Sequence, residues 1–264
     1  MPYTPSEADQ QFIKIAKEEF QYDVAVKQFG NTLWIYVPGT HDIFKIKPSG
    51  KPSAPAAVRP FSVQYLDGRF EGRQMILEYD IIPATKPSKA NTLATGYSPE
   101  FTEKYGKITN AISRAYLNME ALPEFIVTVF ADTKNGIEVI NTVFTQDLKQ
   151  YYLSAIPYEE YLLRVLTETN GSPEIINDTA GEHLPYSEMT LSSFLARQVT
   201  NRVTFKFQQS DFPPQKSIFE ELLTIVQNTF RAYDFSDFDT VVLEDVRSHA
   251  QETFNYEQVL TVVK

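Results

Sequence analysis

Apolar side chains recur at helical spacing in three stretches of the chain, and strand-like runs follow each stretch. The first stretch predicts a helix from about Pro5 to Gln21, with Thr4 as its N-cap and Glu7 as the partner in a capping box. One face of that helix carries Ala8, Phe12, Ile15, Ala16 and Phe20. Because such an apolar face needs a partner, we expect it to pack on the strands that follow.

Two strands are predicted after this helix, and the turn dipeptide Gly30-Asn31 joins them. The second strand spans residues 32–37, where β-branched and aromatic residues dominate. The same order of helix, strand and strand returns from Ser98 onward, with a hairpin turn predicted at residues 132–136. A third copy with a less distinct turn begins at Ser217.

Other elements are predicted between these copies. A further hairpin is predicted over residues 61–82 with its turn at Asp67-Gly68, and two short helices are predicted after Thr145 and Pro157. A helix over residues 191–199 is expected to run into a half-buried strand at residues 203–207.

These elements predict an α+β protein in which antiparallel sheets carry helices on one face, in two layers built from about three α-β-β units. We expect residues 1–82 to form an N-terminal unit with an inserted hairpin. Residues 83–97 are predicted to be a polar linker, and residues 98–264 a C-terminal region with two further units. Whether the units share one sheet or form two domains stays open.

Composition and charge narrow the classes of function. The chain has 264 residues, of which 42% are apolar, and it carries 24 Lys and Arg against 34 Asp and Glu, a net charge of −10. That apolar fraction suffices for a packed core and excludes wholesale disorder. Because an acidic chain repels phosphate backbones, we expect no nucleic acid partner.

Most familiar catalytic groups are missing from the sequence. There is no cysteine, and the three histidines, His41, His183 and His249, lie far apart, each predicted to be an exposed loop residue. Phosphate-binding glycine loops, a GxSxG elbow and an HExxH motif are all absent. We therefore predict no catalytic residue, no metal site and no cofactor.

A pair of carboxylates is the remaining route to catalysis. Glu78 and Asp80 share one face of a predicted strand, where two acids could bind a divalent cation or transfer protons. The favoured interpretation is that both lie on the solvent face of that strand. Its core face would then consist of Met75, Leu77, Tyr79 and Ile81.

Aromatic residues are abundant, with 19 Phe and 15 Tyr. Tyr151 and Tyr152 cluster with further tyrosines around the two short helices, and Trp34 and Tyr36 share one strand face. Exposed aromatic side chains mark protein interfaces or carbohydrate platforms, although we expect most of these residues in the core. The candidate binding residues are Trp34, Tyr36, Glu78, Asp80, Tyr151 and Tyr152.

No window of about 18 uninterrupted apolar residues occurs, so no transmembrane segment is predicted. The first residues have neither the basic nor the apolar region of a signal peptide. Two interpretations stay open: a cytoplasmic protein, or a mature chain whose export leader lies upstream of Met1.

Three segments resemble uncharacterised bacterial envelope lipoproteins: the helix at residues 10–20, the strand at 32–38 and the turn region at 132–138. The resemblance extends over residues 7–47 and 98–166. It implies a place in the cell envelope or periplasm, with membrane contact only through a lipid anchor on an upstream cysteine. It carries over no active-site residue.

The sequence thus predicts a non-catalytic structural or protein-binding module of the bacterial cell envelope, whose partner is another protein or a second copy. One alternative is a hydrolase that uses Glu78 and Asp80, which requires a concave pocket and a raised carboxylate pKa. The other is a small-ligand or glycan binder centred on Trp34, which near-complete burial of that side chain would argue against.

Overall fold

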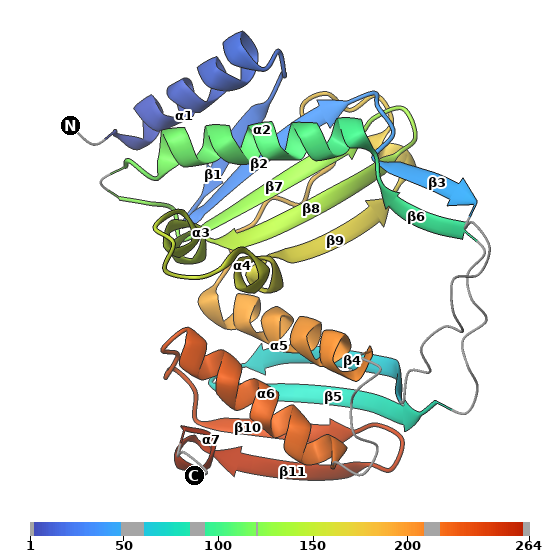
Figure 1. Ribbon diagram of the computed structural model, residues 1–264. Coiled ribbons are helices and arrows are strands. Elements are labelled where there is room, and N and C mark those ends of the chain that lie inside the picture. Colours follow the sequence, from blue (N-terminus) through green and yellow to red (C-terminus); the bar gives the residue numbers. More distant parts are fainter. Residues whose placement is uncertain (1–2, 49–60, 85–92, 120, 209–216, 261–264) are drawn as a thin grey trace. The chain divides into compact units, whose positions relative to one another are not determined.

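The computed structural model describes residues 3–48, 61–84, 93–119, 121–208 and 217–260 (Figure 1). The chain divides into two compact units, and each unit draws on two separate segments. Unit 1 comprises Met1–Pro48 and Leu93–Met189, and unit 2 comprises Ser49–Thr92 and Thr190–Lys264. Both units combine helices with strands, so the chain has the predicted α+β fold.

The boundaries of these units differ from the predicted segments 1–82, 83–97 and 98–264. The hairpin β4 (Phe61–Glu71) and β5 (Gln74–Pro83) groups with the C-terminal part of the chain, because β5 pairs with β10 (Thr240–Asp245). Within the predicted linker, Leu93–Tyr97 forms strand β6, and residues 85–92 lie outside the described residues. Strand pairing between distant segments, not chain order, decides which segments share a core.

Unit 1 is built on a five-stranded sheet in the order β1-β2-β7-β8-β9. Its strands are β1 (Ala25–Phe29), β2 (Thr32–Gly39), β7 (Phe125–Asp132), β8 (Ile137–Phe144) and β9 (Leu166–Gly171). The central pair β2 and β7 is parallel, and the other three pairs are antiparallel. Two predicted hairpins, β1-β2 and β7-β8, therefore join through their inner strands.

Two helices cover one face of this sheet (Figure 1). They are α1 (Pro5–Lys14), prolonged by one π-helical turn at Ile15–Glu19, and α2 (Pro99–Tyr116). Thr4 and Glu7 form the predicted capping box of α1, and the Ser98 hydroxyl accepts from the backbone N–H of Phe101 at the start of α2. The predicted apolar stripes of both helices are buried in one core with the facing side chains of the sheet.

Smaller elements complete unit 1. The two short helices predicted from the sequence are α3 (Thr145–Tyr152) and α4 (Tyr158–Arg164). Strands β3 (Phe44–Pro48) and β6 form a separate antiparallel ribbon that the sequence pattern does not predict. A short 3₁₀ turn at Pro173–Ile175 follows β9.

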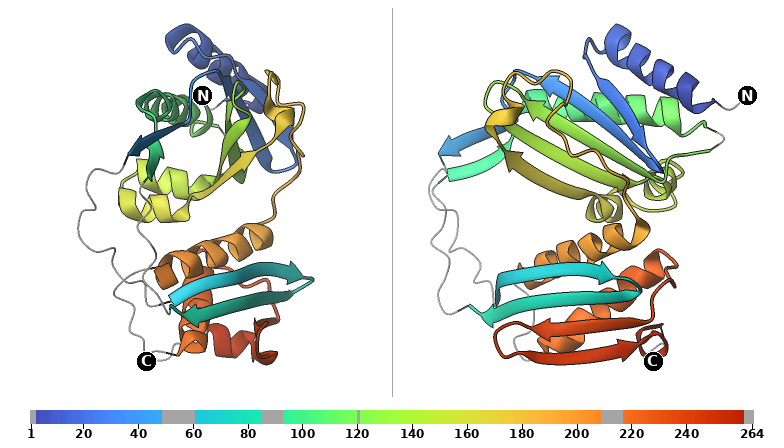
Figure 2. Two further views of the ribbon diagram at one scale, coloured as in Figure 1. Left: turned by 90° about the vertical axis from the view of Figure 1, so that its right-hand side faces the viewer. Right: turned by 180° about the vertical axis from the view of Figure 1, so that it is seen from behind.

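Unit 2 contains a four-stranded sheet in the order β11-β10-β5-β4, again with a parallel central pair, β5 and β10. The third predicted helix-strand-strand copy lies here, as α6 (Ile218–Ala232), β10 and β11 (Ala250–Asn255), so the three copies occupy two sheets. Helices α5 (Leu191–Gln208) and α6 lie over one face, and α7 (Tyr256–Leu260) follows β11 (Figure 2).

The predicted strand at residues 203–207 is wrong, because α5 continues as one helix to Gln208. Val199, Val203 and Phe207 are all buried and recur every four residues, so they share the helix face that packs on β4. The same run also alternates apolar and polar residues, which is the pattern of a strand. Packing in unit 2 selects between two patterns that the local sequence satisfies equally.

We expect the variant Thr204→Ala to be more stable than the parent protein by about 0.5 kcal/mol, because alanine has the higher helix propensity at this half-buried position of α5. The matched control Thr253→Ala lies at an exposed position of strand β11 and should lower stability by a similar amount. Urea unfolding of the two variants measures both changes. A loss of stability in Thr204→Ala would contradict the helical assignment.

Candidate functional site

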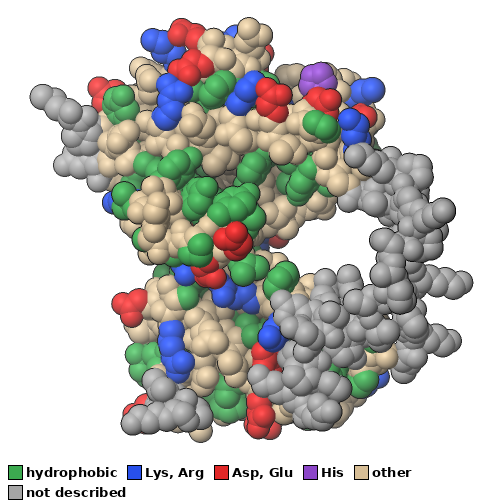
Figure 3. Space-filling model, in the orientation of Figure 1, with side chains coloured by type: hydrophobic (Ala, Val, Ile, Leu, Met, Phe, Trp, Pro, Cys, Tyr) green, Lys and Arg blue, Asp and Glu red, His purple; other side chains and the backbone are tan. Residues whose placement is uncertain are grey.

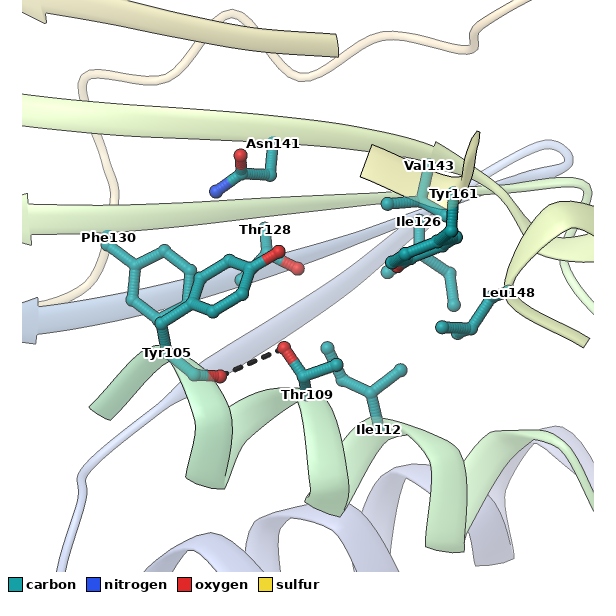
Figure 4. Close-up of a pocket in the computed structure, with 10 residues that line it drawn as sticks. All are labelled: Tyr105, Thr109, Ile112, Ile126, Thr128, Phe130, Asn141, Val143, Leu148 and Tyr161. Carbon is teal, nitrogen blue, oxygen red and sulfur yellow. Dashed lines mark hydrogen bonds between the residues drawn. The ribbon is translucent and has the colours of Figure 1, made fainter. Parts of the chain in front are cut away.

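A small pocket lies in unit 1 between α2, the sheet and the short helices α3 and α4 (Figure 4). Its ten lining residues are Tyr105, Thr109, Ile112, Ile126, Thr128, Phe130, Asn141, Val143, Leu148 and Tyr161. The cavity has a volume of about 20 Å³, which is room for one water-sized group. Most of the wall is aliphatic or aromatic, so the few polar atoms in it determine what the pocket can hold.

A row of polar side chains crosses the floor of the pocket. Thr128 on β7 pairs directly with Asn141 on β8, and Asn141 pairs in turn with Thr167 on β9. The hydroxyl of Thr167 donates to Asn141 Oδ1 at 2.7 Å, and Asn141 and Thr128 are each only 6% exposed. The strands therefore place these three polar side chains in one row, beside apolar residues such as Ile126, Phe130 and Val143.

The amide nitrogen of Asn141 is the unusual atom of this floor. Asn141 Nδ2 is buried, and no described residue accepts a hydrogen bond from it. A buried donor left without an acceptor costs about 1–3 kcal/mol of stability. The pocket thus presents a free N–H donor to whatever occupies it.

Tyrosines form the wall and the mouth of the pocket. Tyr105 and Thr109 are half-buried, and the Tyr152 hydroxyl donates to the Thr109 carbonyl at 3.5 Å. Burial raises the pKa of Tyr105 and of Tyr161, so both hydroxyls stay neutral. The lining contains no other ionisable side chain, and the pocket is therefore uncharged at neutral pH.

Beside this mouth, α3 and α4 expose four large apolar side chains, which we call the α3–α4 surface. Their exposed fractions are 42% for Tyr152, 70% for Leu153, 52% for Tyr158 and 44% for Leu162. Figure 3 shows hydrophobic side chains gathered over this part of unit 1. Three of these side chains belong to the two short helices, and Leu153 is the residue that caps the C-terminus of α3.

The predicted candidates Tyr151 and Tyr152 both belong to this region. The ring of Tyr151 lies 4.7 Å from that of Tyr161, 5.6 Å from that of Tyr152 and 5.8 Å from that of Tyr158. Tyr151 therefore links the pocket wall to the exposed side chains of the α3–α4 surface. The structure brings together the tyrosines that the sequence groups around the two short helices.

Trp34 and Tyr36 lie on the opposite face of the same sheet, where they are 8% and 1% exposed. Residues 172–189, which we call the strap, cross that face (Figure 2). Ile175, Leu184 and Tyr186 of the strap pack with both rings. Trp34 Nε1 donates to the Ser187 carbonyl at 2.9 Å, and the Tyr36 hydroxyl donates to the Asp178 carbonyl at 2.8 Å. These two candidates are core residues, and the burial of Trp34 removes the main support for a ligand platform there.

His183 holds the strap against the sheet and is not the exposed loop residue that the sequence predicts. Its Nδ1 lies 2.5 Å from Asp178 Oδ2, and its Nε2 lies 2.9 Å from Glu138 Oε2 on β8. The side chains of all three residues are at most 9% exposed. Because ionised carboxylates only accept hydrogen bonds, a ring clasped between two of them carries protons on both nitrogens.

Hydrogen bonds outweigh the effect of burial on the pKa values of His183 and Asp178. Burial alone would lower the pKa of His183, but its bonds to Asp178 and Glu138 raise it above 6.5. Burial alone would raise the pKa of Asp178, but the His183 ring and the backbone N–H groups of Ala180, His183 and Gly181 lower it to about 2. The trio is therefore a charged latch, with both ring nitrogens already engaged.

Glu78 and Asp80 lie on the open face of the unit 2 sheet, as the favoured interpretation predicts. Glu78 Oε1 accepts from Arg69 at 2.7 Å, which lowers its pKa, and Asp80 Oδ2 accepts from Arg247 at 3.1 Å. On the other face, Met75, Leu77, Tyr79 and Ile81 are buried. Each acid has its own arginine, and the raised carboxylate pKa that a hydrolase requires is not found at Glu78.

Among the described residues, no three His, Asp or Glu side chains are gathered in a way that could hold a metal ion. In the same part of the chain, no helix is both long enough and apolar enough to cross a membrane.

The sequence does contain a signal for the pocket, although a search for catalytic motifs does not find it. Asn141 interrupts a run of β-branched residues at 139–143, in a position that alternation assigns to the core face of β8. A polar residue at such a position is the informative exception.

No family model, no curated protein and no solved structure matches this chain.

We expect the variant His183→Asn to lower the free energy of unfolding by about 3 kcal/mol at pH 6, because it leaves Asp178 and Glu138 buried without their cation. In the parent protein the contribution of His183 is complete below pH 6.5 and is lost as the pH rises through its raised pKa. The contribution of Asp178 is complete above pH 3.8 and is lost as the pH falls toward about 2.

Denaturant unfolding at a series of pH values measures this dependence. The control variant His249→Asn alters an exposed turn residue with φ of 57°, which asparagine tolerates, and should keep the parent profile. Equal slopes above pH 6.5 in the parent and in His183→Asn would show that the latch does not titrate.

Proposed function

We propose that this protein is a non-catalytic binding module that docks a partner protein on the α3–α4 surface. The observation that carries the proposal is the exposure of four large apolar side chains, 42–70% each, on two consecutive short helices and the C-cap between them. Such side chains exposed side by side are typical of protein interfaces. Tyrosine suits this role because its ring packs while its hydroxyl stays hydrated.

The chemistry of the pocket and of the acidic pair also supports a non-catalytic role. The pocket lining offers neutral hydroxyls and an amide, none of which is activated by a neighbouring base. Glu78 has a lowered pKa and an arginine partner, whereas a general acid needs a raised one. The hydrolase alternative therefore has less support than the binding module.

The net charge of the chain favours a partner of different composition over a second copy. At −10, two copies repel each other, and the repulsion grows as ionic strength falls. A protein with a positive net charge is instead attracted and steered toward the complex. We therefore propose a basic partner with an apolar docking segment.

The location of the module is part of the same proposal. The resemblance of residues 7–47 and 98–166 to bacterial envelope lipoproteins supports a place in the cell envelope. Membrane contact would then come from a lipid anchor on a cysteine upstream of Met1.

Selection of a random peptide library against the intact chain tests the docking surface. We expect the selected peptides to be rich in aromatic and basic residues, which match the exposed rings and the negative charge. They should bind the double variant Leu153→Ser/Tyr158→Ser at least tenfold more weakly, because loss of an interface hot spot, a role in which tyrosine is enriched, costs about 2 kcal/mol or more. Fluorescence anisotropy of a labelled peptide measures the difference.

The matched control is the double variant Ile13→Ser/Phe205→Ser, which changes two side chains that are 42% and 52% exposed elsewhere. It should bind the selected peptides as the parent does. The proposed docking surface would be wrong if the peptides bound Leu153→Ser/Tyr158→Ser with the affinity of the parent protein, or bound both double variants with equal affinity.

A further inference from the structure

The pocket of unit 1 contains a buried donor that the proposed docking of a protein on the α3–α4 surface does not use. Asn141 Oδ1 is occupied by the Thr167 hydroxyl at 2.7 Å, whereas Asn141 Nδ2 has no acceptor among the described residues. Figure 4 shows the amide of Asn141 beside the hydroxyl of Thr128 and the ring of Tyr105. From this geometry we propose that the pocket binds a small neutral molecule through one hydrogen-bond-accepting oxygen, a ketone or an amide.

The free nitrogen specifies an acceptor on the ligand. Burial of a donor without a partner is unfavourable, so an oxygen placed against Asn141 Nδ2 supplies a hydrogen bond that the described side chains do not. An apolar molecule of the same shape recovers nothing from this atom. The floor therefore discriminates a carbonyl compound from its hydrocarbon counterpart.

The rest of the lining specifies a neutral ligand with an apolar body. Five lining residues are purely hydrocarbon: Ile112, Ile126, Phe130, Val143 and Leu148. The lining includes no carboxylate, ammonium or guanidinium group to compensate an ion. Because burial of an uncompensated charge is very costly, carboxylic acids and amines are excluded as ligands.

The size of the cavity specifies how the ligand lies. A volume of about 20 Å³ holds one oxygen-sized group and no ring. The body of the ligand therefore lies at the mouth, where Tyr105, Thr109 and Val143 are half-buried and the Tyr152 hydroxyl bonds to Thr109. Flat aromatic groups stack well on tyrosine rings, so an aromatic ketone combines both requirements.

Two matched probes, acetophenone and ethylbenzene, test this assignment on the full chain. The two molecules have similar size and one ring each, and only the ketone carries an acceptor. We expect acetophenone to bind about tenfold more tightly, as one recovered hydrogen bond to a buried donor implies. Titration followed by NMR should also shift the side-chain amide resonance of Asn141 with the ketone and leave it unchanged with the hydrocarbon.

Variants of the floor separate recognition from folding. Asn141→Leu keeps the size of the side chain but removes the donor, so the preference for the ketone should disappear. Asn201→Leu alters an exposed asparagine on α5 and should keep the tenfold preference. If Asn141→Leu does not fold, the shift of the Asn141 side-chain amide resonance in the parent protein still distinguishes the two probes.

Two outcomes would overturn the proposal. In the first, both probes bind equally well to the parent protein. In the second, neither probe binds and the Asn141 amide resonance stays fixed, which would mean that the cavity holds a single water molecule. Both outcomes leave the docking of peptides on the α3–α4 surface untouched, so the two proposals fail independently.

Discussion

Parallel pairing between the inner strands of two hairpins is the interaction on which each unit depends. In unit 1, β2 and β7 pair along their whole length, from Thr32 with Phe125 to Gly39 with Asp132, and in unit 2 β5 and β10 pair in the same sense. An isolated hairpin is only marginally stable in water. Joined through their inner strands, the hairpins of unit 1 make a sheet that α1 and α2 cover on one face and the strap covers on the other. The polar floor of the pocket exists because β7 and β8 lie inside that sheet.

The sheet of unit 1 buries polar groups on both faces and compensates them differently. On the strap face, His183 meets a carboxylate at each nitrogen, so the buried charges are paired and the latch adds stability. On the helix face, Asn141 has one partner for its oxygen and none among the described residues for its nitrogen. Most buried polar groups in proteins have a hydrogen-bond partner, so the unpaired nitrogen of Asn141 is the exception that calls for an explanation. The two faces of one sheet thus differ in how completely their buried polar groups are paired.

Sequence patterns predict the elements that depend on residues close together in the chain, such as capped helices and tight hairpins. The caps Thr4, Ser98 and Ser217 and the stripes after them specify three helices, and turn signals specify the hairpins β1-β2 and β7-β8. The turn predicted at Asp67-Gly68 is wrong, because both residues pair with β5 inside β4 and the chain turns only after Glu71. The same reasoning groups Tyr151 and Tyr152 with their neighbouring tyrosines. It fails at residues 203–207, where the run fits both a helix and a strand, and at β9, where polar residues conceal a strand that pairs with β8.

By itself, the sequence determined the α+β class, the order of most elements, their caps and the acidic, cysteine-free character of the chain. Only the tertiary structure decided that β4 and β5 belong with β10, that the strap covers Trp34, and that His183 lies between Asp178 and Glu138. Periodicity and capping depend on residues three to four positions apart, and such neighbours are evident in the sequence itself. Burial, strand partners and side-chain pairs depend on segments far apart in the chain, and those segments meet only in the folded protein.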